Sequence, residues 1–186
     1  RMQGKEALPA LQMATKLLPD DAEAYNNLGN VLRDLGQYDD AAASYRRALE
    51  IKPDYAEAYG NLGAALQDLG QLDGAVANCR RALEIKPDFA EAHSSLGNAL
   101  QALGHLDGAV AAYHQALAIK PDYTAAHSDL LFVHNYLSDQ PAAVLLAEAQ
   151  RFGDLVARQA RPSRDWHNVP DSNQCLRVGM VSGDLR

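Results

Sequence analysis

Asparagine side chains recur in this sequence at a fixed spacing and have the chemistry needed to hold a peptide. Two sets of positions follow a spacing of 34 residues: Asn27, Asn61, Ser95 and Asp129, and Asn30, Ala64 and Asn98. An asparagine offers both a donor and an acceptor, so a row of them can hydrogen-bond the backbone of an extended peptide whatever its sequence. The alternative is that asparagine is simply tolerated on an exposed helix face. Its poor helix propensity favours the functional interpretation.

Histidines are the other residues that could do chemistry here, as metal ligands. His93 and His127 are one spacing apart and take the place that Tyr25 and Tyr59 fill earlier, which predicts a packing role. His127 and His134 lie two helical turns apart, without the neighbouring cysteine or carboxylate that a zinc site would need. No nucleophile, base or metal set converges in the sequence. We therefore expect no metal site, no cofactor and no active site within these residues.

The 34-residue spacing belongs to a repeated sequence. Residues 22–55, 56–89 and 90–123 align without a gap, with 24 of 34 positions identical in the first pair and 22 of 34 in the second. A fixed period of this length is typical of a solenoid, in which each unit buries its apolar face on its neighbours.

Each unit is expected to form two antiparallel helices. The apolar stripe of the first helix, at spacings of three and four, consists of Tyr25, Leu28, Leu32 and Leu35. Gly36 follows it where a helix end needs a left-handed residue, and a second stripe runs from Tyr38 to Leu49 before Pro53 ends it. The sequence thus predicts helix breaks near Gly36, Gly70 and Gly104 and near Pro53, Pro87 and Pro121.

This pattern resembles the tetratricopeptide repeat. The marker residues that carry the resemblance are Tyr25, Leu28, Gly29, Leu32, Ala41, Tyr45, Ala48 and Pro53. Later units depart from the pattern at His93 and Cys79. The resemblance implies an all-α superhelix whose first helices line a concave groove that binds a protein or peptide. The expected groove residues are Asn27, Asn30, Asn61, Ser95, Asn98 and Asp129.

The rest of the chain is assigned by continuing the repeat frame in both directions. We expect residues 1–21 to hold the second helix of a truncated repeat, 124–137 one helix of a partial repeat, 138–160 a capping or adaptor helix, and 161–186 a linker and the first strand of a truncated domain. The apolar stripe expected on the capping helix is Leu145, Ala149, Phe152 and Val156. Leu131 replaces the repeat glycine, so packing there must differ. Unpartnered ends predict dimers or higher oligomers, or a swapped or disordered tail.

A second resemblance concerns the last residues. The segment RVGMVSGDLR (177–186), together with NNLGNVLRDLG and IKPDYAEAYGNLG, resembles bacterial relatives of protein O-GlcNAc transferase and the plant SPINDLY proteins. Those proteins carry tetratricopeptide repeats with an asparagine ladder, a helical region and then a two-lobed glycosyltransferase. The resemblance implies a module that recruits protein substrates, while the active-site His-Pro that follows V-S-x-D in the family would lie beyond Arg186. The alternative is a stand-alone scaffold without a catalytic domain.

Composition and charge limit the kinds of partner that the chain can bind. The net charge of −7 and a pI near 5.3 argue against nucleic acid or an anionic membrane as partner. No apolar run approaches the roughly 20 residues that span a bilayer. Two cysteines, Cys79 and Cys175, make a disulfide framework improbable and favour a reducing cytoplasm.

Overall fold

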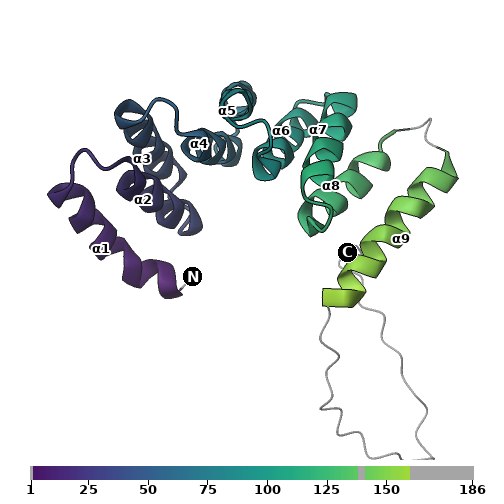
Figure 1. Ribbon diagram of the computed structural model, residues 1–186, viewed down its shortest axis with the longest axis horizontal. Helices are drawn as coiled ribbons and strands as arrows, with labels where there is room; N and C mark the ends of the chain where they lie inside the picture. Colours follow the sequence, from purple (N-terminus) through teal and green to yellow (C-terminus); the bar gives the residue numbers. More distant parts are fainter. Residues whose placement is uncertain (1, 138–140, 160–186) are drawn as a thin grey trace, which may run out of the picture.

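A computed structural model describes residues 2–137 and 141–159, and every regular element in these ranges is an α-helix. The helices are α1 (Met2–Leu17), α2 (Ala22–Asp34), α3 (Tyr38–Ile51), α4 (Ala56–Asp68), α5 (Leu72–Ile85), α6 (Ala90–Ala102), α7 (Leu106–Ile119), α8 (Thr124–His134) and α9 (Ala142–Gln159). They form an arch with α1 at one end and α9 at the other (Figure 1). The predicted all-α repeat architecture is confirmed. The strand expected within 161–186 lies outside the described residues.

The turn inside each unit is made by a glycine with left-handed backbone. Within residues 2–137 and 141–159, positive φ occurs at Gly36 (79°), Gly70 (72°) and Gly104 (78°). Such angles cost a glycine little because it has no Cβ. After Gly36, the N–H of Gln37 donates to the carbonyl of Leu32 at 2.9 Å, which satisfies one of the carbonyls that a helix end leaves free. The predicted breaks at these glycines are confirmed.

The turns between units follow from proline. The helices α3, α5 and α7 end at Ile51, Ile85 and Ile119. Each helix therefore stops two residues before a proline, because proline has no N–H to donate and disfavours helical backbone in the residue before it. The breaks predicted near Pro53, Pro87 and Pro121 are confirmed as well.

Within each unit the two helices touch at a glycine. A Cβ built on Gly29 would lie 2.5 Å from Cε1 of Tyr45, and one on Gly97 would lie 2.5 Å from Cε1 of Tyr113. In the middle unit Gly63 faces Cys79, whose Sγ would be 2.6 Å away. The large partners of these glycines are fully buried. The absence of a glycine side chain therefore sets how closely the second helix can approach the first.

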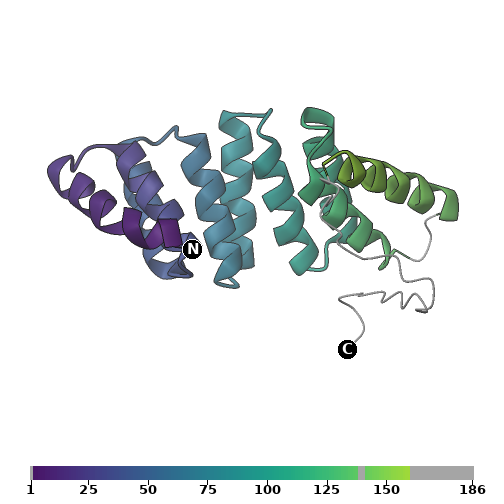
Figure 2. The same cartoon turned by 90° about the horizontal axis from the view of Figure 1, so that it is seen from below.

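The arch curves toward its first helices. The first helices α2, α4, α6 and α8 contact one another from unit to unit, whereas the second helices α3, α5 and α7 contact only first helices among the described residues. The first helices are thus the more crowded set and line the inner face of the arch, onto which Figure 2 looks.

The last helix pair departs from this packing. Among the described helices α9 contacts only α8, and less extensively than α3 contacts α2. Leu131 explains this looser contact, because a leucine stands where a glycine allows close approach in the other units. The expected apolar stripe of α9 was partly wrong. Ala149 and Val156 are exposed, whereas Leu155 is half-buried and Glu148 is buried.

The ends of the arch expose apolar side chains. Met13, Leu17 and Leu18 are 56%, 72% and 55% exposed at the end of α1, and α1 runs on through Pro9. These side chains fit the expectation of an unpartnered surface, while the domain division and self-association stay predictions. No helix in residues 2–137 or 141–159 has the length and apolar character needed to cross a bilayer.

The glycine contact yields a stability prediction. Gly97→Ala should lower the free energy of unfolding by about 1–3 kcal/mol, because the new methyl group must displace the buried ring of Tyr113. Gly108→Ala is the control, since Gly108 meets only the flexible end of Leu100 and the first unit carries Asp40 at this position. Urea unfolding followed by circular dichroism measures both. Equal stability of the two variants would contradict a steric role for Gly97.

Candidate peptide-binding groove

The predicted groove residues lie on the first helices that line the inner face, but their surroundings differ. Asn27 on α2 is exposed, whereas Asn61, Ser95 and Asp129 on the following first helices are half-buried. No described residue bonds the side chain of Asn27, so both its donor and its acceptor are available to a ligand.

Asn61 already makes one bond inside the fold. Its Nδ2 donates to Oδ1 of Asn26 at 2.9 Å, and Asn26 is only 6% exposed. This bond joins α2 to α4 and leaves the carbonyl oxygen of Asn61 for a ligand. Asn26 was not among the expected groove residues, because the corresponding position in the next unit is Gly60. The adjacent pair Asn26-Asn27 is the signal that could have pointed to it.

Asn30 and Asn98 are bonded to the buried tyrosines of their own units. The Tyr45 hydroxyl donates to Oδ1 of Asn30 at 2.8 Å, and the Tyr113 hydroxyl lies 2.6 Å from Oδ1 of Asn98. Burial raises the pKa of both hydroxyls, so they remain protonated donors. The middle unit has Ala64 in place of the asparagine and Cys79 in place of the tyrosine. It therefore lacks both the donor and the acceptor of this bond. Asn30 and Asn98 thus have a structural role besides the predicted one.

The inner face changes character at α8. There Phe132 is 50% and Tyr136, in the following turn, 61% exposed, with ring centroids 5.2 Å apart and planes at 60°. In the repeat frame Phe132 takes the place of Asn30 and Asn98, and Tyr136 that of Asp34 and Asp68. Continuing the row of Asn30 and Asn98 by one unit leads to Phe132, and continuing the row of Asp34 and Asp68 leads to Tyr136. The expected groove residues included Asp129 of the fourth unit but neither aromatic residue.

The charges of the groove are mostly acidic or already paired. Arg33 on α2 forms an ion pair with Asp68 on α4, with 2.9 Å between Nε and Oδ2. Burial raises the pKa of Asp129, and no described residue bonds its carboxylate. Of the groove residues named so far, Arg33 alone is basic, and Asp68 already pairs with it.

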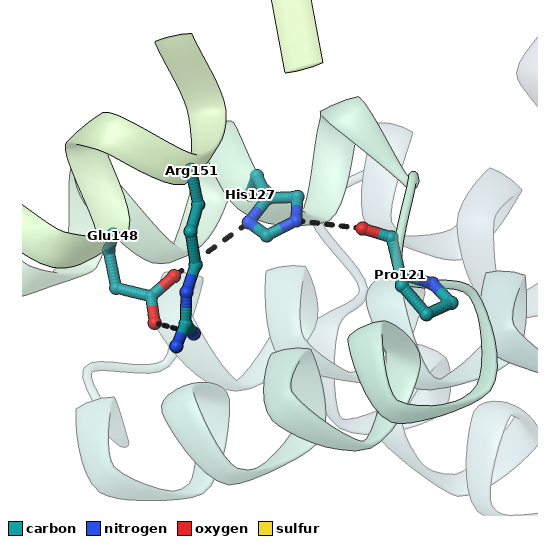
Figure 3. A network of polar contacts seen from close by, with 4 residues as sticks. All are labelled: Pro121, His127, Glu148 and Arg151. Carbon is teal, nitrogen blue, oxygen red and sulfur yellow. Dashed lines mark hydrogen bonds and ion pairs between the residues drawn. The ribbon is translucent and has the colours of Figure 1, made fainter. Parts of the chain in front are cut away.

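A second polar cluster joins α9 to the repeats (Figure 3). Nε2 of His127 lies 3.0 Å from the carbonyl oxygen of Pro121 and must carry the proton, since a carbonyl only accepts. Its Nδ1 is 3.8 Å from Oε2 of Glu148, whose other oxygen accepts from Arg151 at 3.0 Å. His93 repeats the first bond with Pro87 at 3.0 Å. The two histidines therefore hold the turns between units.

A pocket of about 690 Å³ adjoins this cluster and is lined by residues of α7, α8, α9 and the turn before α8. Glu148 is a carboxylate near His127 that the sequence analysis did not anticipate, because it comes from the next helix. Even so, the described residues contain no group of three His, Cys, Asp or Glu side chains placed to hold a metal ion.

His134 is a polar residue in an apolar position. It is 3% exposed, neither ring nitrogen has a hydrogen-bond partner, and it stands where the other units have Leu32, Leu66 and Leu100. Burial lowers its pKa, which keeps the ring neutral. An unpaired buried polar group is costly, so His134 weakens the packing of α8.

The fold and the inner face define a helical-repeat module for protein interaction. Family models for tetratricopeptide repeats match residues 10–43, 29–70, 65–104 and 90–123. The matches together run from residue 10 to residue 123, and this part of the chain belongs to the tetratricopeptide repeat family. None of the curated protein sequences matches the chain.

Solved structures share the fold. MamA (41-end) from Desulfovibrio magneticus RS-1 is 23% identical, with a TM-score of 0.73 over 85% of this chain and 88% of that one. The first tetratricopeptide domain of human RPAP3 is 25% identical, with a TM-score of 0.62 over 64% and 94%. The first such domain of Spaghetti (RPAP3), bound to the HSP90 peptide SRMEEVD, is 24% identical, with a TM-score of 0.61 over 64% and 94%.

His134 yields a prediction about pH. His134→Leu should raise the free energy of unfolding by about 1–3 kcal/mol, because it removes an unpaired buried polar group. In the folded chain the pKa of His134 is lowered, so the unfolded chain binds the proton more readily. The stability of the unaltered chain is therefore full above about pH 6.5, the ordinary histidine value, and falls as the pH drops below it.

Urea unfolding of both proteins at pH 8 and pH 5 measures this difference, and the advantage of His134→Leu should be larger at pH 5. The control is His105→Gln, which restores the residue of the other units at an exposed turn. A gap between the two proteins that does not widen on acidification would contradict the assigned burial of His134.

Proposed function

We propose that the chain binds extended peptide segments of partner proteins along the inner face of its first helices. The observation that carries this proposal is the row formed by Asn27, Asn61 and Ser95, which stand at equivalent positions of successive units and keep polar atoms accessible. Amide and hydroxyl groups of this kind pair with the N–H and C=O groups of an extended backbone. Such pairing selects for extended conformation and not for side chains.

The RPAP3 domain bound to SRMEEVD supports peptide binding by this architecture. The peptide itself has three carboxylate side chains, and such groups need cations. In this chain Arg33 is engaged by Asp68, and Asp34 and Asp129 add negative charge to the same face. We therefore infer that its peptides are neutral or basic.

We further propose that the module recruits protein substrates for an O-GlcNAc transferase-like glycosyltransferase. The support is the resemblance of residues 177–186, which lie outside the described part of the structure. The tetratricopeptide matches concern only the repeats. The test is the gene sequence after the codon for Arg186. A His-Pro followed by alternating strands and helices would support the transferase, and a stop codon or further repeats would favour the stand-alone scaffold.

The groove yields a prediction about affinity. Each lost hydrogen bond to a peptide backbone should cost about 0.5–1.5 kcal/mol, so Asn27→Ala should weaken binding about two- to tenfold. Combining it with Asn61→Ala should weaken binding about five- to 150-fold if the two losses add. The loss should be similar for peptides of different sequence. Fluorescence anisotropy with labelled peptides, selected on the unaltered chain from a random display library, measures this.

Two controls separate binding from folding. Gln115→Ala removes an amide from an exposed position of α7 on the outer side and should leave affinity unchanged. Asn26→Ser, which copies Ser94 of the third unit, breaks the bond to Asn61 but keeps the Asn61 amide. Unchanged affinity of the double variant, with an intact thermal melt, would refute the groove.

A further inference from the structure

The α8 end of the inner face carries a cluster of unlike side chains. Asp129 and Phe132 lie three residues apart on α8, which places them side by side on one helix face. Tyr136 follows in the turn, and its ring touches that of Phe132 edge-on. We call these three residues the acid–aromatic cluster. The earlier units have amide or carboxylate groups at the two aromatic positions, apart from Ala64 and Ala102, so the aromatic surface is confined to this end.

The aromatic rings of the cluster are unusual for a surface. Phe132 and Tyr136 are at least half-exposed, although Leu130 and Val133 on the same helix are fully buried. The rings contribute little to the core, yet they hold each other at 5.2 Å. Such a pair leaves at least one ring face open, and the face of an aromatic ring is its negative side.

The carboxylate of the cluster, on Asp129, has no hydrogen-bond donor among the described residues. Asp129 is half-buried, desolvation raises its pKa, and no described residue donates to it. The negative charge of Asp129 in turn raises the pKa of the nearby Tyr113 hydroxyl. A partly desolvated carboxylate without a donor gains more from a cation than an exposed one does.

No ion pair or hydrogen bond within residues 2–137 and 141–159 joins a cation to Asp129. The helix α9, which packs on α8, carries Arg151, paired with Glu148 at 3.0 Å, and Arg158. The helices α6, α7 and α8 contain neither lysine nor arginine. Lys120, in the turn between α7 and α8, is paired with Glu91 at 3.3 Å. The histidines of these helices include His93 and His127, which bond the turn carbonyls, and the buried His134. The cluster is therefore an acidic and aromatic surface that is complementary to a positively charged group.

We propose that the acid–aromatic cluster binds the guanidinium group of an arginine side chain in the bound peptide. A guanidinium is planar, so it can stack on the open face of Phe132 or Tyr136 while its N–H groups donate to Asp129. A carboxylate accepts two such bonds at once, which favours arginine over lysine. This inference rests on the proposed peptide groove, because it names one side chain that the peptide would carry at the α8 end.

The test uses a probe that has no extended backbone. Nα-acetyl-arginine N-methylamide is titrated into the ¹⁵N-labelled chain, and its citrulline analogue, which has the same shape without the charge, serves as the matched ligand. We expect the arginine probe to shift the amide signals of residues 125–137 and to bind at least about tenfold more tightly than the citrulline probe. Equal binding of the two probes, or shifts confined to other helices, would overturn the proposal.

Two variants borrowed from the repeats themselves test the roles of the residues. Asp129→Asn copies Asn27 and Asn61, and Phe132→Asn copies Asn30 and Asn98, so the fold already accommodates both exchanges. Asp129→Asn should abolish the preference for arginine over citrulline. Phe132→Asn should weaken the arginine probe about two- to fivefold. Retention of the full preference by Asp129→Asn, with native chemical shifts elsewhere, would overturn the proposal.

Asn27→Ala separates this inference from the groove itself. It removes a backbone contact at the far end of the inner face, so it should weaken the library peptides and leave the arginine probe unaffected. If the arginine probe binds but Asn27→Ala leaves peptide affinity unchanged, the cluster is supported and the groove is refuted. If peptides bind but the probe does not discriminate arginine from citrulline, the groove stands and the cluster fails.

Discussion

The contact between a glycine of the first helix and the large side chain opposite it sets the geometry of every unit. Because Gly29 and Gly97 have no Cβ, the rings of Tyr45 and Tyr113 lie directly against the first helices. This close approach also brings each hydroxyl through the unit to the asparagine on the inner face. The residue that fills the core thus also orients a residue of the groove. Packing and binding surface are therefore coupled inside the first and third units, which carry both the tyrosine and the asparagine.

The repeats were predictable because the sequence states the same physical constraints three times. Glycines such as Gly36 and prolines such as Pro53 end helices for local reasons, so their effects could be read without knowing the neighbours. The structural role of Asn30, as acceptor for the Tyr45 hydroxyl, could not be predicted in this way. It depends on a residue fifteen positions away, whose distance from Asn30 is set by the glycine contact. The same holds for Asn61, whose partner Asn26 is on the preceding unit.

Prediction was weakest at α9, where the period breaks. An apolar stripe was expected through Ala149 and Val156, but the helix turns Glu148 inward. A carboxylate is buried there because His127 and Arg151 lie beside it, and neither contact can be inferred from helical periodicity. Leu131 and His134 depart from the repeat in the same region. Replacing glycine and leucine at these positions loosens the last pair of helices relative to the earlier ones.

The middle unit has a property that its neighbours lack, because Cys79 replaces their tyrosine. Its thiol is fully buried against Gly63, and burial raises its pKa to about 12. A thiol reacts with disulfide reagents through its thiolate, so Cys79 is protected for as long as α4 and α5 stay together. Its labelling rate consequently reports how often the centre of the arch opens. In a chain with Cys175 replaced by serine, that rate measures the local opening of one repeat at a thiol that the protein already carries, and it is separable from the fraying of either end.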